Sequence, residues 1–272
     1  MKKSVSPEEE AKLSRTLTPL MLWGLGVGYV ISGMYFGWNL GLEKGGTLGL
    51  AIATFFIIIL YVTFTFSYAE LASAIPKAGG GFDYTRRAFG DTWGFVAGMA
   101  QNIEFIFAPP AIAFAIGAYF NLFFPSVPII VISIISYILF TALNIRGVKI
   151  SALFELGITL FAVGELLLFA GITLPHFSSD AFFENSLPNG ISGIFAALPF
   201  AIWFFLGLEG VANVAEETIN PQRTIKVGFS SALITLIVLC LLVFAGAVGV
   251  GGWENIVYRA DGSTSDSPLP LA

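Results

Sequence analysis

The sequence predicts an all-α polytopic membrane protein, and three observations support this fold class. Hydrophobic residues make up 56% of the 272-residue chain. Charged residues make up only 11%, whereas a soluble domain carries about 25% and needs them to cover its water-facing surface. Apolar stretches of the length that crosses about 30 Å of hydrocarbon recur along the chain. Soluble, disordered and nucleic-acid-binding proteins are therefore excluded, and a lipid bilayer is the expected surrounding.

Seven apolar stretches are long enough to be membrane spans. A polar tail, residues 1–16, precedes them, and residues 251–272 after them are again polar. Residues 17–250 are thus the predicted transmembrane domain. Its spans are residues 17–42, 47–74, 93–120, 127–143, 151–174, 191–215 and 226–250.

Basic residues orient the spans, because cytoplasmic loops carry an excess of lysine and arginine. With the N-terminus inside, only Lys44 and Arg259 of the 13 basic residues fall in outer segments. The inner segments hold the rest, which are Lys2, Lys3, Lys12, Arg15, Lys77, Arg86, Arg87, Arg146, Lys149, Arg223 and Lys226. We therefore predict a multi-pass protein of the cell (inner) membrane, with a cytoplasmic N-terminus and an extracytoplasmic segment at residues 251–272.

Two spans carry residues that interrupt a helix. Span one contains Gly24 and Gly28 and then Ser-Gly at residues 32–33, and span six contains Pro199 and then Gly-Leu-Glu-Gly at residues 207–210. Unwound backbone inside a membrane is tolerated only against protein or a water-filled cavity. Interrupted spans at matching positions in two halves point to a transporter substrate site. Glycines also allow close helix packing, and we assign that role to Gly24 and Gly28.

Spans one and six match each other if the repeat unit is five helices. Residues 17–174 would then form the first repeat, and residues 191–250 would begin the second. A five-helix repeat predicts ten core spans, and seven are present. We therefore expect an N-terminal fragment, truncated within its second repeat.

Three groups of residues resemble the signatures of the amino acid–polyamine–organocation (APC) transporters. They are YAEL with PKAGGGFDY (68–71 and 76–84), LNIRGVK (143–149), and GLEG with EE and NPQRTI (207–210, 216–217 and 220–225). Within that superfamily, ISGMYFGWNLGL at residues 31–42 is most similar to the ethanolamine permeases. The resemblance implies a leucine-transporter-like inverted-repeat fold with spans one and six unwound near the bilayer midplane, and about twelve spans in a full member.

Each break would expose polar backbone groups. Free carbonyls carry partial negative charge and suit an ammonium group, whereas free N–H groups suit a carboxylate or hydroxyl. We expect such carbonyls near residues 29–31 and 205–206, and such N–H groups near residues 33–34. The predicted substrate-binding residues are Tyr29, Ile31, Ser32, Gly33, Met34, Glu104, Trp203, Phe205, Leu206, Gly207 and Glu209.

Carboxylates within the spans are candidates for function, because an ionised group at a helix centre costs at least ~2.5 kcal/mol on insertion scales. Glu104 lies in span three, Glu165 in span five and Glu209 in the break of span six. Glu104 and Glu209 are expected to balance a substrate ammonium, and Glu165 is the candidate coupling residue. The alternative for each of the three is a structural role as a protonated or hydrogen-bonded carboxyl group. Trp203 flanks the break and would cover a cation by a cation–π contact or act as a gate.

These features predict a permease rather than an enzyme. The expected function is secondary active transport of a small amine such as ethanolamine by alternating access, and the alternative substrates are neutral or cationic amino acids. A transporter-like membrane sensor is the alternative of another class. The coupling ion or counter-substrate is left open. A membrane enzyme is disfavoured by the single histidine, an ATPase by the absence of a phosphate-binding loop, and no cofactor, metal or catalytic residue is expected.

Overall fold

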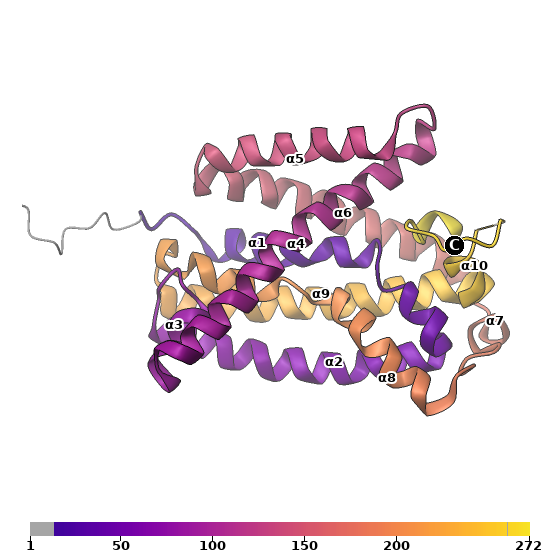
Figure 1. Cartoon of the computed structure of the whole chain (residues 1–272), viewed down its shortest axis with the longest axis horizontal. Helices are drawn as coiled ribbons and strands as arrows, with labels where there is room; N and C mark the ends of the chain where they lie inside the picture. The colour runs from indigo at the N-terminus through magenta and orange to yellow at the C-terminus, as the bar shows by residue number, and fades with distance from the viewer. Residues whose placement is uncertain (1–13, 260) are drawn as a thin grey trace, which may run out of the picture.

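The structure, a computed structural model, describes residues 14–259 and 261–272 and is built from helices. Figure 1 shows α1, α2 and α9 running along the long axis, with α4 crossing them obliquely. The α-helices are α1 (Pro19–Ile31), α2 (Leu40–Ala74), α3 (Gly81–Phe89), α4 (Asp91–Phe123), α5 (Ile129–Ile145), α6 (Val148–Thr173), α7 (Ser179–Phe183), α8 (Gly190–Ala201), α9 (Pro221–Gly251) and α10 (Trp253–Val257). The 3₁₀ segments are η1 (Ser32–Met34), η2 (Leu174–His176), η3 (Ile202–Phe204), η4 (Leu208–Glu217) and η5 (Leu269–Leu271).

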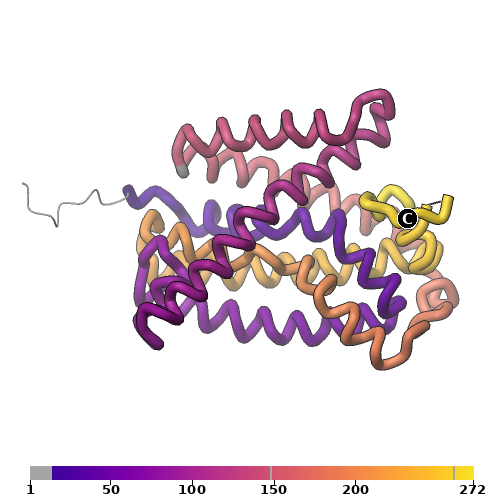
Figure 2. Tube along the Cα trace, in the orientation of Figure 1, coloured from indigo at the N-terminus to yellow at the C-terminus, as the bar shows by residue number. Residues whose placement is uncertain are grey.

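The helices correspond to the predicted spans and confirm an all-α polytopic membrane protein. In the described part of the chain, five helical segments are long and apolar enough to cross a membrane: Leu40–Ala74, Asp91–Phe123, Lys149–His176, Gly190–Glu217 and Pro221–Gly251. The two remaining predicted spans correspond to the shorter apolar segments Pro19–Met34 and Ile129–Ile145. Figure 2 places the start of α1 and the C-terminus at opposite ends of the bundle, as an odd number of crossings requires.

The outer part of span one begins later than the sequence predicted. We expected the helix to restart near residues 33–34, but the chain makes a 3₁₀ turn at η1, bends at Gly37 and becomes helical again at Leu40. Gly37 has φ +89°, a backbone conformation that glycine adopts at little cost. The break is therefore longer than predicted.

Helix α2 holds two predicted elements, the outer part of span one and the whole of span two. They are divided at Gly46, whose φ of +66° and ψ of −174° are not helical. A Cβ atom at Gly46 would lie 2.5 Å from both the Pro188 ring and the Ser186 carbonyl oxygen. The bend is thus fixed by a close approach of the loop that precedes α8.

Span six is interrupted as predicted, and its α-helix changes to a 3₁₀ turn just before the interruption. Helix α8 ends at Ala201, η3 follows, and Gly207 adopts a left-handed φ of +101°. Pro199 inside α8 donates no backbone N–H group and weakens the helix from within. The carbonyls that we expected at residues 205–206 therefore lie directly after the end of η3, in the turn before η4.

The core is centred on aromatic residues beside the two breaks. Trp38, Phe204 and Phe205 are fully buried. The Trp38 ring stacks on Phe204 with centroids 5.3 Å apart, and Phe205 lies 5.3 Å from Tyr61 of α2. Because these residues come from both interrupted spans and from span two, the core holds the breaks in place.

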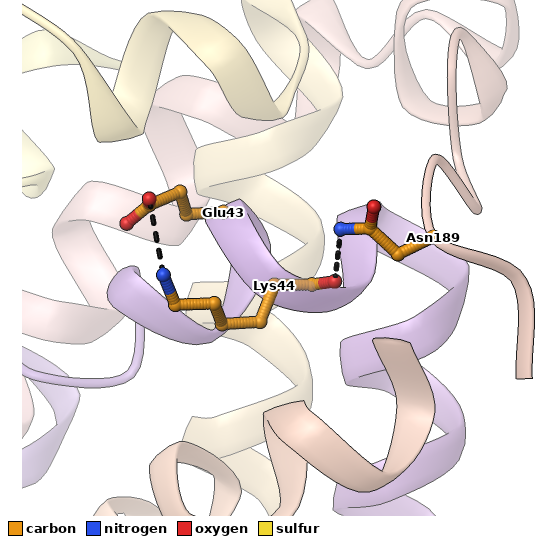
Figure 3. Close-up of polar contacts among 3 residues, drawn as sticks. All are labelled: Glu43, Lys44 and Asn189. Atoms are coloured by element: carbon orange, nitrogen blue, oxygen red, sulfur yellow. Dashed lines mark hydrogen bonds and ion pairs between the residues drawn. The ribbon is translucent and has the colours of Figure 1, made fainter. Parts of the chain in front are cut away.

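Two sets of hydrogen bonds join span one to span six away from the breaks. At the start of α1, the N–H groups of Thr16 and Leu17 donate to the Glu217 carbonyl (2.8 and 3.0 Å), and Ile219 N–H donates to the Leu17 carbonyl (3.0 Å). At the other end, the Asn189 side chain donates to the Lys44 carbonyl at 2.8 Å, while the Lys44 ammonium pairs with Glu43 at 3.1 Å (Figure 3).

The segment 251–272, predicted as a polar extracytoplasmic loop, packs onto the bundle. It contains α10 and η5, and the side chains of Ser265 and Ser267 are buried. The Asn39 side chain, buried in the break of span one, donates a 2.9 Å hydrogen bond to the Ser265 carbonyl. The side of the membrane on which this segment lies stays a prediction.

Cysteine accessibility tests the orientation. In a Cys240→Ala background, Asp180→Cys and Lys77→Cys each place one thiol at an exposed position. We expect an impermeant thiol reagent added to intact cells to label position 180 and not position 77, because only Asp180 lies on the predicted outer side. Labelling of position 77 alone would reverse the topology, and permeabilised cells should show both.

Candidate functional site

The interrupted backbones of span one and span six contact each other at two glycines. A Cβ atom on Gly33 of span one would collide with the Trp203 carbonyl of span six. On the other side of the contact, a Cβ atom on Gly207 of span six would lie 3.0 Å from the Tyr29 carbonyl oxygen of span one. The unwound backbones are therefore in direct contact, and this contact depends on the absence of side chains at both positions.

A cavity of about 870 Å³ runs along this contact, between the breaks and helices α4 and α6. Nine of the twelve predicted site residues line it: Tyr29, Ile31, Ser32, Gly33, Glu104, Glu165, Trp203, Leu206 and Gly207. Met34 and Phe205 are fully buried in the core instead. Glu209 lies beside the cavity without lining it. What these residues bind stays a prediction.

The charges along the cavity have one sign. Glu104, Glu155 and Glu165 line it, and its described lining contains no lysine, arginine or histidine. In residues 14–259 and 261–272, the salt bridges are Lys44–Glu43 and Arg86–Asp91, and neither reaches the cavity. The cavity is thus suited to a positively charged ligand.

Glu104 and Glu209 come together from spans three and six. The two carboxyl groups are neighbours, and the hydrogen bonds of the described residues include none between them. Glu209 Oε1 accepts the Gly207 N–H at 3.3 Å, so it satisfies a backbone group that the break sets free. Glu104 Oε1 is buried and has no hydrogen-bond partner in the described structure.

The helix around Glu104 is irregular because Pro109 and Pro110 lie inside α4. A proline has no N–H group to bond the carbonyl four residues earlier, so the carbonyls of Phe105 and Ile106 lose their helical partners. Phe105 and Pro109 both line the cavity. Uncompensated carbonyls therefore lie one and two residues after Glu104.

Glu165, the predicted coupling residue, contacts the break of span one. The Tyr35 hydroxyl lies 3.1 Å from Glu165 Oε2 and 3.3 Å from the Ala162 carbonyl oxygen. The Tyr119 hydroxyl of α4 donates to the Tyr35 carbonyl at 2.5 Å. Sequence reasoning missed Tyr119, although it lies about four turns after Glu104 on nearly the same face of the helix.

Glu155 also lines the cavity but was not among the predicted site residues. It lies against Gly28 of α1, where an added Cβ would collide with the Glu155 carboxyl and lie 2.6 Å from Thr159 Oγ1. Thr159 donates to the Gly24 carbonyl at 3.1 Å. These contacts agree with the close-packing role assigned to Gly24 and Gly28. Glu155 and Thr159, four residues apart on α6, share the face that meets these glycines.

Comparison with known proteins identifies the family. The profile of the family described as amino acid permease matches residues 17–266. The chain belongs to the amino acid permease family. This assignment agrees with the resemblance seen in the sequence motifs, and it places the interrupted spans and their cavity within a permease fold.

Individual relatives differ in what their names say they transport. An uncharacterized transporter of Rhizobium meliloti (strain 1021) is 30% identical over 93% of this chain and 57% of its own length. The methylthioribose transporter of Bacillus subtilis (strain 168) is 28% identical over 88% of this chain and 56% of its own length. The low-affinity putrescine importer PlaP of Escherichia coli (strain K12) is 26% identical over 86% and 54%. The chain therefore spans about half the length of these curated relatives.

The glycine contact between the breaks predicts a stability difference. Gly33→Ala should lower the melting temperature of the detergent-solubilised protein, because overpacking costs about 1–3 kcal/mol and the obstructing Trp203 carbonyl is backbone. Gly164→Ala on α6 is the control, since nothing lies within 4 Å of an added Cβ there. Thermal unfolding of the two variants and the wild type measures the difference. Equal melting temperatures for Gly33→Ala and wild type would contradict the backbone contact.

Proposed function

We propose that this permease moves a small organic amine, with ethanolamine as the expected substrate, by secondary active transport across the cell (inner) membrane. The observation that carries the proposal is the sign of the charge along the cavity, where Glu104, Glu155 and Glu165 share the wall with no basic side chain among the described residues. Carboxylates inside a membrane segment are costly unless a cation or a proton compensates them. A protonated amine supplies that cation.

The backbone at the breaks supports the same substrate class. An ammonium group has three N–H donors and no acceptor, and helix α1 ends at Ile31 beside the cavity with carbonyls of partial negative charge. Glu104 and the Phe105 carbonyl, which Pro109 leaves without a helical partner, add acceptors on the other side. The site is thus rich in acceptors, which favours an amine over an anionic group.

Neutral and cationic amino acids are the alternative substrates. A zwitterion also needs donors for its carboxylate, and we expected these from the N–H groups near residues 33–34. That backbone packs against the Trp203 carbonyl, and Met34 lies outside the cavity lining. A free carboxylate would also face three glutamates, which disfavours an amino acid.

In the proposed alternating-access mechanism, one helix bundle rocks against another around this fixed site.

Competition between matched solutes tests the substrate class. The protein, produced from its complete gene and reconstituted in liposomes, should take up labelled ethanolamine. Unlabelled ethanolamine should compete at least about tenfold better than ethylene glycol, which replaces the ammonium by a hydroxyl, because a hydrogen bond to a charged group contributes about 1.5–3 kcal/mol. Alanine should compete weakly.

Liposomes without protein are the control for leakage of the uncharged amine. Saturable alanine uptake that ethanolamine leaves unchanged would favour the amino acid alternative and contradict the amine assignment.

A further inference from the structure

We infer that Glu104 is the specificity-determining residue that contacts the substrate ammonium, and that Glu209 is a positioning residue that fixes the turn of span six. The inference rests on the proposed amine transport and divides between two residues a role that the sequence assigned to both. It follows from four features of the structure: access to the cavity, hydrogen-bond partners, neighbouring acceptors and the surrounding rings.

Access to the cavity separates the two carboxylates. Glu104 lines the cavity and Glu209 does not. Glu104 Oε1 is nevertheless shielded from solvent and has no partner in the described structure. A buried polar atom without a hydrogen bond costs free energy, so this oxygen is left available for a donor that the protein itself does not supply.

Glu209 already has a structural partner. It accepts the Gly207 N–H at the left-handed turn that ends the break of span six. Its carboxyl is a neighbour of Glu104. Glu209 therefore fixes the turn of span six beside the side chain of span three.

The neighbours of Glu104 complete an acceptor site for an ammonium group. Phe105, whose carbonyl lacks a helical partner because of Pro109, lies next to Glu104 on the cavity wall. An added Cβ on Gly210 would lie 2.9 Å from the Tyr29 ring and 3.4 Å from the Phe105 ring. The turn of α4 that carries Glu104 is thus beside the C-terminal end of α1, where aromatic faces favour a cation.

The other two cavity carboxylates have different neighbours. Glu165 lies at hydrogen-bond distance from the Tyr35 hydroxyl. Glu155 lies against Gly28 on the small-residue face where α6 packs on α1. Among the described cavity carboxylates, Glu104 is therefore the one that combines a solvent-shielded oxygen without a partner and a neighbouring carbonyl at Phe105.

Paired substitutions in the complete transporter test this division of roles. Glu104→Gln should raise the KM for ethanolamine by about tenfold or more, as expected for loss of a charge-assisted hydrogen bond. It should also reduce the preference for ethanolamine over ethylene glycol, while Vmax stays within about threefold. Glu209→Gln should keep the KM, because its amide oxygen still accepts the Gly207 N–H. Glu209→Ala, which cannot accept it, should lower transport and the thermal stability.

Glu184→Gln is the matched control, since Glu184 is exposed between α7 and α8. If Glu104→Gln does not fold, Glu104→Asp takes its place: with the charge retained, it should preserve the preference for ethanolamine. An unchanged KM and preference in Glu104→Gln would overturn the inference, as would loss of the preference in Glu104→Asp. So would an equal rise in KM in Glu209→Gln. A wild type that takes up no amine at all contradicts the proposed function instead, whatever the variants do.

Discussion

The structure depends on one constraint, which is that polar backbone freed from a helix inside a membrane must lie against protein or a cavity. The breaks of spans one and six meet this constraint together. Gly33 lies on the Trp203 carbonyl, Gly207 lies by the Tyr29 carbonyl, and residues of both breaks line the cavity. The aromatic core around Trp38 and Phe204 then shields the unwound backbone from lipid.

The number and type of helices could be predicted because hydropathy is a local property. A span is recognised from about 20 consecutive residues, without knowledge of its neighbours. The ends of the broken helices were predicted less well. The division at Gly46 is fixed by contact with Ser186 and Pro188, some 140 positions away in the sequence. Because no local pattern records such a contact, the sequence did not show that the outer end of span one and the whole of span two form one bent helix.

In the site, too, features set by the local sequence could be predicted, whereas features set by contacts between distant residues could not. Glycines and prolines marked the breaks, so Ser32, Gly33 and Gly207 could be placed at the cavity from the sequence. Glu209 was expected to face a ligand because it lies in a break, but the Gly207 N–H holds it beside the cavity. Glu155 was left out because its contact with Gly28 joins spans one and five. Sequence shows that a carboxylate is within a span, but not which way it points.

The links between spans one and six have a mechanical consequence. The pair is fastened near Leu17 by backbone hydrogen bonds, at the middle by the glycine contacts, and near Lys44 by Asn189. Two spans that contact each other at three points along their length cannot easily slide or rotate past each other. We therefore expect the two broken spans to move together as one unit. An opening of the cavity would then require movement of the opposite wall, where α4 carries Glu104 and packs against α5.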